Sequence, residues 1–281
     1  MDPTRGPTPK ASLTRHGLTP KKHFGQNFLA DPRLADKIAG LALEGSGTAL
    51  ELGAGLGALT RPLLARGGHV IAVERDRDLL PVLRDDLAES VASGQLTLVE
   101  ADAKSIDPGA LLAGRPRPHV LCGNLPYQIT GPLLELAAHH AHQLDRVVFL
   151  VQLEVADRIC AQPGSKAYGA LTVFLAAQYA ARRAFVIKRG AFHPQPAVDS
   201  AVVVLDTLSP PRARETDAFR ALVSAAFGKR RKTLRNAWQG VLGASAAELE
   251  ARAARVGIDL MRRGETLDVS EFARMAQEYE P

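Results

Sequence analysis

The stretch Asn124–Tyr127 reads Asn-Leu-Pro-Tyr and directly follows a short apolar run. The side-chain carbonyl of Asn124 and the backbone carbonyl of Leu125 can each accept one N–H of an amino group on a flat base. Such contacts hold the nitrogen in line and favour the positive charge that develops as it attacks a methyl sulfonium. Pro126 fixes the turn, and the Tyr127 ring can stack on the base, which is worth about 1–3 kcal/mol in nucleic-acid sites. In isolation, the same residues also fit a proline turn with a surface tyrosine.

A glycine-rich turn lies earlier in the chain. Gly53, Gly55 and Gly57 sit between a strand candidate and a helix candidate, where the backbone must turn sharply and can approach a ligand closely. With Ala58 they also satisfy the dinucleotide-binding fingerprint. Glu74 ends the next strand candidate and can accept hydrogen bonds from both hydroxyls of a ribose. These motifs predict a nucleoside cofactor without separating NAD, FAD and S-adenosylmethionine, and a solvated carboxylate is the simpler alternative for Glu74 alone.

A second acidic residue, Asp102, lies just past the third strand candidate. An acceptor at that place suits an adenine amino group, although Asp102 equally fits the N-cap of a helix. Gly53, Glu74, Asp102 and Asn124 all follow consecutive strand candidates, so we expect them at one edge of a single sheet. Their convergence favours a methyl-transfer site over a simple loop.

The elements that must position these residues alternate between short apolar runs and longer helical patterns. This alternation predicts a parallel sheet covered by helices on both faces. The predicted strands are 48–55, 69–76, 96–103, 119–124 and 146–152, and the predicted helices between them are 58–67, 77–90 and 131–142. Beyond residue 153 the pattern predicts a helix at 168–180 and strands at 182–190 and 200–206. We expect a Rossmann-like α/β domain over 21–206 with a mostly parallel, seven-stranded sheet.

Basic residues concentrate at the two ends of the chain. Residues 1–24 contain five Lys and Arg against one Asp, and residues 207–281 contain thirteen against ten Asp and Glu. The Pro- and Thr-rich residues 1–20 predict a disordered basic arm, and 207–281, which has no strand candidate, predicts a small helical domain. Basic ends suggest a polyanionic partner, although a solvated basic surface explains the charge equally well.

The composition argues against several other classes. No apolar run approaches the ~20 residues that a membrane helix requires, and the N-terminus has no apolar secretory segment. Cys122 and Cys160 are the two cysteines, so we expect no disulfide and a cytoplasmic location. We also expect no metal site, because no Cys or His grouping has zinc-ligand spacing, and His139, His140 and His142 fit a helix end.

Several separate motifs together resemble the KsgA/RsmA family of small-subunit ribosomal RNA adenine dimethyltransferases, within the class I S-adenosylmethionine-dependent fold. The resemblance runs from about residue 20 to the C-terminus. It rests on KKHFGQNFL (21–29), ELGAGLG (51–57) with Glu74 and Asp102, NLPY (124–127), FHPQPAVDS (192–200) and FGKRRKTLRN (227–236). It implies transfer of methyl groups from S-adenosylmethionine to N6 of two adjacent adenosines near the 3′ end of 16S rRNA, and a role in 30S biogenesis.

The resemblance also assigns roles to individual residues. Gln26, Asn27 and Leu29 are implied to close over the cofactor, and Phe192 to sandwich the target base together with Tyr127. The prolines after Phe192 stiffen its loop, and a core phenylalanine beneath that loop is the alternative.

The segment 227–236 is basic and has apolar residues at helical spacing. Phe227, Leu234 and Trp238 predict a continuous helical seam against the core. The basic residues would then project away from the seam and meet RNA phosphates, contacts that position RNA without reading its sequence. They are Lys229, Arg230, Arg231, Lys232 and Arg235. A solvated basic face is the alternative.

Departures from the family pattern are few, and three alternative functions remain. Leu153 stands where the family usually has Lys, and Gly131 replaces a hydroxyl residue. The alternatives are a 23S rRNA methyltransferase of the macrolide-resistance type, a DNA adenine methyltransferase and a mainly non-catalytic 30S assembly factor. We expect a monomer, because no interface signal stands out.

Overall fold

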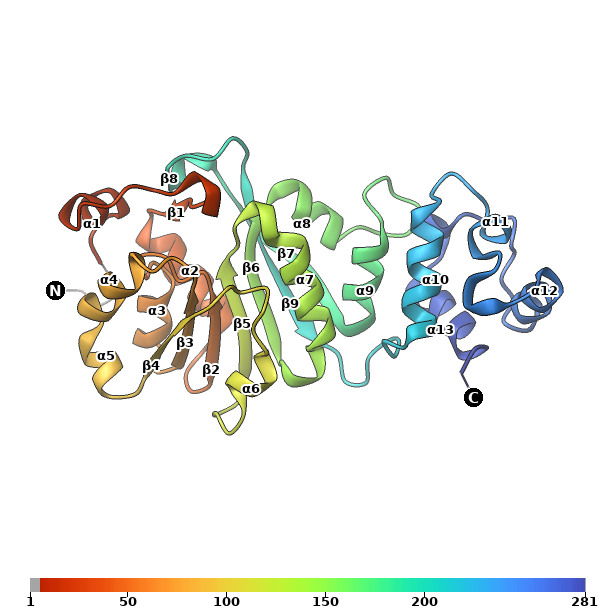
Figure 1. The fold of residues 1–281 in the computed structure, drawn as a ribbon, viewed down its shortest axis with the longest axis horizontal. Helices are drawn as coiled ribbons and strands as arrows, with labels where there is room; N and C mark the ends of the chain where they lie inside the picture. The colour runs from red at the N-terminus through yellow and green to blue at the C-terminus, as the bar shows by residue number, and fades with distance from the viewer. Residues whose placement is uncertain (1–5, 281) are drawn as a thin grey trace. The chain divides into compact units, whose positions relative to one another are not determined.

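The computed structural model describes residues 6–280, which divide into two compact units (Figure 1). One unit runs to Ala156 and includes Arg182–Thr207; the other contains Asp157–Ala181 and continues from Leu208. The sequence pattern placed all of 21–206 in one domain. Packing instead assigns Asp157–Ala181 to the second unit, because its apolar residues join that unit's core.

The sheet of the first unit has seven strands in the order β4-β3-β2-β5-β6-β9-β7. The first five of these run parallel, and β9 is antiparallel to β6. The strands are β2 (Thr48–Leu52), β3 (His69–Glu74), β4 (Leu96–Glu100), β5 (His119–Asn124), β6 (Arg146–Gln152), β7 (Tyr179–Ile187) and β9 (Ser200–Thr207). The mostly parallel α/β sheet predicted from the sequence is therefore confirmed.

One helix precedes β2, five connect consecutive parallel strands, and one follows β6. They are α2 (Pro32–Ala42), α3 (Thr60–Ala65), α4 (Leu79–Asp86), α5 (Ala88–Ala92), α6 (Pro108–Leu112), α7 (Thr130–His139) and α8 (Leu153–Ile159). An Asp-Pro pair begins both α2 and α6: Asp31 Oδ1 accepts from the Arg33 amide at 2.9 Å, and Asp107 Oδ1 from the Gly109 amide at 2.8 Å. Side-chain capping followed by proline satisfies the first amide groups of a helix.

The basic arm predicted to be disordered contains a helix, α1 (Pro9–Arg15). Its first turn is capped by Thr8, and its Leu13 side chain is only 4% exposed. Leu13 packs in a small cluster with Leu56, Leu79 and Val82. The prediction of disorder is thus wrong for α1, because the Leu13 side chain packs against this cluster. Residues 1–5 lie outside the described residues.

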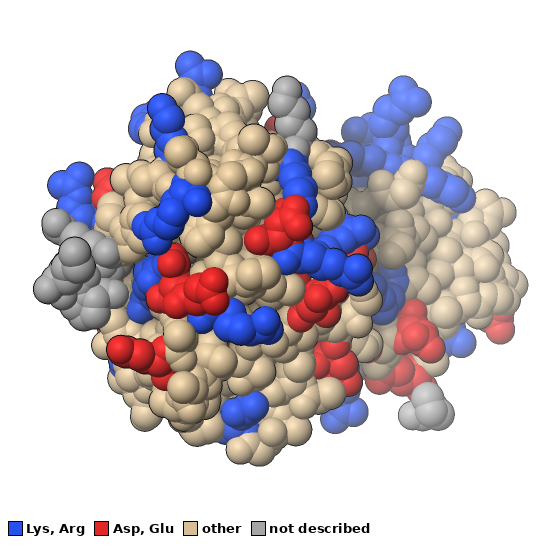
Figure 2. All heavy atoms as spheres, turned by 60° about the vertical axis from the view of Figure 1, so that its left-hand side comes forward, with Lys and Arg blue, Asp and Glu red and all other residues tan. Residues whose placement is uncertain are grey.

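Charged side chains of both signs lie beside one another on the face shown in Figure 2. Ion pairs in the first unit include Arg61 with Asp86 at 2.7 Å and Arg77 with Glu100 at 2.5 Å. Pairs as exposed as Arg77 with Glu100 contribute little to folding, typically about 0–1 kcal/mol. Among the described residues, no helix has the length and the apolar character needed to cross a bilayer.

Gly123 in β5 lies where no side chain fits. A Cβ atom at this position would stand 2.4 Å from the Leu52 carbonyl oxygen of the neighbouring strand. Because both groups belong to the backbone, one strand must shift, so Gly123→Ala is expected to lower the free energy of unfolding by about 2–3 kcal/mol. Urea unfolding monitored by circular dichroism measures this change.

The matched control for that substitution is Gly131→Ala in the first turn of α7. A Cβ atom at Gly131 meets nothing within 4 Å, so alanine should raise stability by up to about 1 kcal/mol. Equal unfolding midpoints for Gly123→Ala and the unchanged chain would contradict the packing described for β2 and β5.

The second unit is helical and has its own core. Its helices include α9 (Ala170–Gln178), α10 (Asp217–Gly228), α11 (Leu234–Trp238), α12 (Ala246–Arg255) and α13 (Val269–Gln277). Trp238 is fully buried among these helices, and its indole N–H donates to the Leu222 carbonyl at 2.8 Å. This partner satisfies the polar atom that burial of a tryptophan otherwise leaves unpaired.

The continuous helix predicted across 227–238 is interrupted. α10 ends at Gly228, and α11 begins only at Leu234. Phe227, Leu234 and Trp238 still contribute to one core cluster. The segment Lys229–Thr233 between the two helices is not helical, and its basic side chains are exposed there instead of facing the packed seam.

Candidate active site

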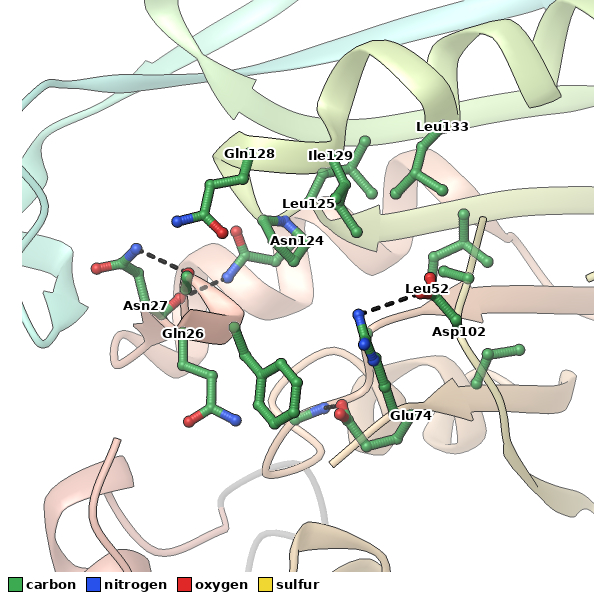
Figure 3. A pocket seen from close by; sticks show the side chains of 18 of the residues that line it. Gln26, Asn27, Leu52, Glu74, Asp102, Asn124, Leu125, Gln128, Ile129 and Leu133 are labelled. Carbon is green, nitrogen blue, oxygen red and sulfur yellow. Dashed lines mark hydrogen bonds and ion pairs between the residues drawn. The ribbon is translucent and has the colours of Figure 1, made fainter. Parts of the chain in front are cut away.

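A cavity of about 170 Å³ lies at the carboxyl ends of the parallel strands (Figure 3). The chain turns there between strand and helix, so polar groups that follow neighbouring strands meet. The predicted site residues that line it are Gln26, Asn27, Gly53, Gly55, Glu74, Asp102, Asn124, Leu125, Pro126 and Tyr127. The structure therefore brings together residues from five separate segments of the chain at one edge of the sheet.

The Glu74 carboxylate is held rigidly at the end of β3. Its Oε2 accepts from the Gly55 amide at 2.8 Å and its Oε1 from the Asp76 amide at 2.7 Å. Burial raises the pKa of Glu74, and these backbone hydrogen bonds counteract the shift. Each carboxylate oxygen can accept more than one hydrogen bond, so the preorganised group suits the two hydroxyls of a ribose.

The glycine-rich turn needs glycine for its backbone conformation. Gly53 and Gly55 have φ angles of +73° and +59°, a left-handed region that side chains rarely adopt. A Cβ atom at Gly55 would also come within 3.1 Å of the Phe28 ring. The glycines therefore leave space beside Glu74. This space and the Glu74 carboxylate together fit a nucleoside cofactor.

Asp102 lies across the cavity and is largely buried, with 24% of its side chain exposed. Its Oδ1 accepts from the Lys104 amide at 3.0 Å, and its Oδ2 forms an ion pair with Arg75 at 3.1 Å. The N-cap alternative is wrong, since the next helix begins only at Pro108 and is capped by Asp107. Asp102 instead stabilises a tight turn and keeps its carboxylate at the cavity wall.

The amide of Asn124 has a defined orientation. Its Nδ2 donates to the backbone carbonyl of Asn27 at 2.7 Å, drawn as a dashed line in Figure 3. Asn27 in turn donates from its own Nδ2 to the Gly25 carbonyl at 3.1 Å. Because the donor end of Asn124 is committed to the N-terminal segment, the acceptor Oδ1 is the end available to a substrate amino group.

The residues after Asn124 form a fixed turn. The Leu125 amide donates to the Leu150 carbonyl at 3.1 Å, and its side chain is 1% exposed. Pro126 has φ −57°, the value its ring imposes. The Tyr127 hydroxyl lies 2.9 Å from the Ser200 hydroxyl, and burial raises the pKa of Tyr127. The half-buried Tyr127 side chain is therefore neutral. Its hydroxyl is anchored at Ser200, and the rest of the ring lies at the cavity.

Asp76 is a buried carboxylate next to the site that the sequence reasoning missed. This carboxylate is 3% exposed and receives hydrogen bonds from Lys21 Nζ at 2.5 Å and from Gln26 Nε2 at 2.8 Å. Burial alone would raise the pKa of Asp76, but these donors lower it below its usual value. Asp76 thus ties the segment before β1 to Glu74. Its position two residues after Glu74 was the only signal in the sequence.

Two predicted residues do not reach the cavity. Leu29 in β1 (Phe28–Leu29) pairs with Phe192 in β8 (Phe192–His193), and both side chains join the hydrophobic core with about 5% exposure. The structure therefore supports the core alternative for Phe192 over stacking on a base. Leu29 acts indirectly, because the short sheet holds the neighbouring Asn27.

The basic segment of the second unit is exposed, and part of it is paired. Arg230 Nε contacts Glu265 at 2.9 Å, and Arg235 contacts Glu250 at 2.7 Å. The other predicted RNA-contacting side chains, Lys229, Arg231 and Lys232, are also exposed in the turn before α11. In the described chain, no group of three or more His, Cys, Asp or Glu side chains is arranged to hold a metal ion.

Comparison with known proteins identifies the family. A model of the ribosomal RNA adenine dimethylase family matches residues 17–280. Ribosomal RNA small subunit methyltransferase A of Anaeromyxobacter dehalogenans (strain 2CP-C) is 44% identical, over 96% of this chain and 97% of its own length. The protein of the same name from Moorella thermoacetica is 41% identical, over 99% of both chains.

Solved structures show the same fold. A dimethyladenosine transferase from Plasmodium falciparum superimposes with a TM-score of 0.76 at 23% identity, over 90% of this chain and 97% of that one. The 23S rRNA methyltransferase ErmE superimposes with a TM-score of 0.66 at 24% identity, over 91% and 100%. The chain belongs to the ribosomal RNA adenine dimethylase family and is an S-adenosylmethionine-dependent rRNA methyltransferase.

Proposed function

We propose that this protein methylates N6 of two adjacent adenosines near the 3′ end of 16S rRNA in the small ribosomal subunit, giving N6,N6-dimethyladenosine. The observation that carries the proposal is the fixed amide of Asn124, whose donor end is bound to Asn27. An amide held this way presents an acceptor to an amino group. The near full-length likeness to small-subunit methyltransferases supports the choice of rRNA.

S-adenosylmethionine supplies an electrophilic methyl group when bound. Glu74 binds its ribose hydroxyls, and Asp102 accepts a hydrogen bond from its adenine amino group. Gly53 and Gly55 leave room for the cofactor, and Gln26 and Asn27 close the segment over it. The ion pair of Lys21 with Asp76 at 2.5 Å holds that segment in place.

The target base must leave its helix or loop to reach the cavity. Asn124 Oδ1 and the Leu125 carbonyl then accept the N6 hydrogens and orient the nitrogen lone pair toward the methyl carbon. Tyr127 stacks on the ring. As the nitrogen bonds to the methyl carbon, the sulfur–methyl bond would break and S-adenosylhomocysteine would leave, so that the positive charge passes from sulfur to nitrogen. A proton would then be lost from the nitrogen to water. No general base is required, because the attacking amine is neutral.

The second unit contributes affinity for the ribosomal particle. Lys229, Arg230, Arg231, Lys232 and Arg235 neutralise phosphates of the 30S subunit or its precursor. The protein acts as a monomer in the cytoplasm. Its arm and basic turn bind the same polyanion, which accounts for the basic ends of the chain.

Methyl transfer from labelled S-adenosylmethionine tests this function directly. Unmodified 30S subunits are compared with naked 16S rRNA, 50S subunits and duplex DNA, and the adenosines are resolved by mass spectrometry. Dimethyladenosine from 30S subunits alone is the expected result. Label in 50S subunits would favour the 23S alternative, label in DNA the DNA alternative, and binding to 30S without transfer an assembly factor.

A further inference from the structure

Arg75 lines the cavity beside Asp102. It follows Glu74 at the end of β3, and its guanidinium Nη1 lies 3.1 Å from Asp102 Oδ2. The carbon of the same guanidinium lies 5.3 Å from the centroid of the Phe24 ring, which also lines the cavity. An arginine therefore occupies the side of the cavity where the proposed adenine acceptor sits.

Both oxygens of Asp102 already have partners. Oδ1 accepts from the Lys104 amide at 3.0 Å, while Oδ2 faces Arg75 at 3.1 Å and Lys104 Nζ at 3.7 Å. An incoming adenine amino group needs a lone pair on this carboxylate. A carboxylate oxygen accepts about two hydrogen bonds, and Oδ2 already faces both Arg75 and Lys104 Nζ. The adenine amino group, which is also a donor, therefore competes with Arg75 for this oxygen.

We propose that Arg75 competes with the adenine of the cofactor for Asp102 and thereby limits cofactor affinity. The inference rests on the proposed role of Asp102. Adenine binding breaks the Arg75–Asp102 pair, and the Phe24 ring gives the displaced guanidinium a nearby cation–π partner. Arg75 is an affinity-determining residue that takes no part in the transfer itself.

A limited affinity for the cofactor and its product suits an enzyme that transfers several methyl groups in succession. Each dimethylated adenosine consumes more than one cofactor, so the spent S-adenosylhomocysteine must leave between transfers. In many enzymes, release of the product limits the turnover rate more than the chemical step does. Because product and cofactor share the same adenosine, a competitor for the adenine acceptor weakens both and speeds exchange.

The size of the effect follows from the exposure of the pair. Arg75 is 58% exposed, and exposed ion pairs are weak and screened by salt. Removing the arginine should therefore lower the dissociation constant for S-adenosylhomocysteine by about two- to five-fold. Raising the salt concentration should reduce the difference between the unchanged protein and the variant.

Isothermal titration of S-adenosylhomocysteine into the full chain tests the proposal. Arg75→Met is expected to bind the product about two- to five-fold more tightly than the unchanged protein. Arg77→Met is the matched control: Arg77 belongs to the same strand end and pairs with Glu100 at 2.5 Å, but it is not among the cavity-lining residues. Thermal unfolding of each variant confirms that it is folded.

Two outcomes would show that Arg75 does not compete with adenine for Asp102. Unchanged affinity in Arg75→Met shows that the ion pair does not oppose binding, and weaker affinity shows that Arg75 contacts the cofactor favourably. Asp102→Ala separates this failure from that of the proposed site. If Asp102→Ala binds the product as tightly as the unchanged protein, the adenine role of Asp102 is wrong, whatever Arg75→Met does.

Discussion

Replacement of Asn124 by alanine is expected to lower methyl transfer into 30S subunits by about 100- to 1,000-fold. The substitution removes the acceptor Oδ1 that orients the attacking nitrogen and favours its developing positive charge. It also removes the hydrogen bond from Nδ2 to the Asn27 carbonyl, which is 2.7 Å long. Initial rates with saturating 30S subunits and labelled S-adenosylmethionine measure the loss.

The control for Asn124→Ala is Gln95→Ala. Gln95 also donates its side-chain amide to a backbone carbonyl, that of Leu64, at 3.0 Å. It precedes β4 at the amino ends of the strands, whereas the cavity lies at their carboxyl ends. Transfer by Gln95→Ala should remain near that of the unchanged protein.

Binding measurements show which step is lost. Asn124→Ala should still bind 30S subunits, because the basic residues of the second unit are untouched. Rates of Asn124→Ala within about tenfold of the unchanged protein would mean that this amide does not orient the base. Transfer that is lost together with 30S binding would instead point to an unfolded protein or a role in docking.

The sheet and the carboxylates beside it could be predicted because their positions follow from local rules. Glu74 and Asn124 end their strands and Asp102 closely follows one, and parallel strands present their carboxyl ends at one edge. The left-handed glycines of the turn are likewise a local requirement. That these groups line one cavity needed no information beyond the order of the strands.

Other parts of the site depend on contacts between distant segments, and no periodic pattern reports these. Asp76 receives its hydrogen bond from Lys21, which lies 55 residues earlier. Leu13 and Leu18 are sparse apolar residues in a polar segment, so the burial of Leu13 beside Val82 could not be inferred from periodicity. Tertiary packing decided both positions.

Phe192 illustrates the limit of transferring a role by motif. The family resemblance of its loop implied that the ring stacks on the target base. Pairing of β8 with β1 instead turns the ring into the core, where it is 5% exposed. A two-residue strand is too short to predict from alternation, so the sequence could not separate the two roles.

The stability of the first unit is expected to fall as pH rises from about 5 to about 8, because of one buried carboxyl group. Glu51 lies in β2 between two other strands and is 2% exposed. Burial raises the pKa of Glu51 to about 8, and the charge of Glu74 adds to the shift, while a hydrogen bond from Thr60 at 2.6 Å opposes it. Glu51 is therefore largely protonated near neutral pH.

The direction of the pH dependence follows from the number of protons that the folded and unfolded chains bind. Between the ordinary pKa of 4.5 and the folded value of about 8, the folded chain keeps a proton that the unfolded chain releases. Unfolding is thus favoured as pH rises, by on the order of 5 kcal/mol across the whole interval. Glu51→Gln keeps an acceptor for Thr60 but cannot ionise, so its stability should be less dependent on pH.

Urea unfolding of both proteins at steps from about pH 5 to about pH 9 measures this difference. Glu135→Gln makes the same chemical change on an exposed face of α7 and should keep the slope of the unchanged protein. Parallel pH profiles for Glu51→Gln and the unchanged protein would show that Glu51 ionises in the folded chain.

That outcome would also bear on catalysis, since Glu51 lines a cavity of about 40 Å³ together with Gly53 and Asn124. A neutral Glu51 leaves the substrate amino group to the uncharged acceptors described above, whereas an ionised one would add a negative charge to the neighbouring cavity that Asn124 also lines.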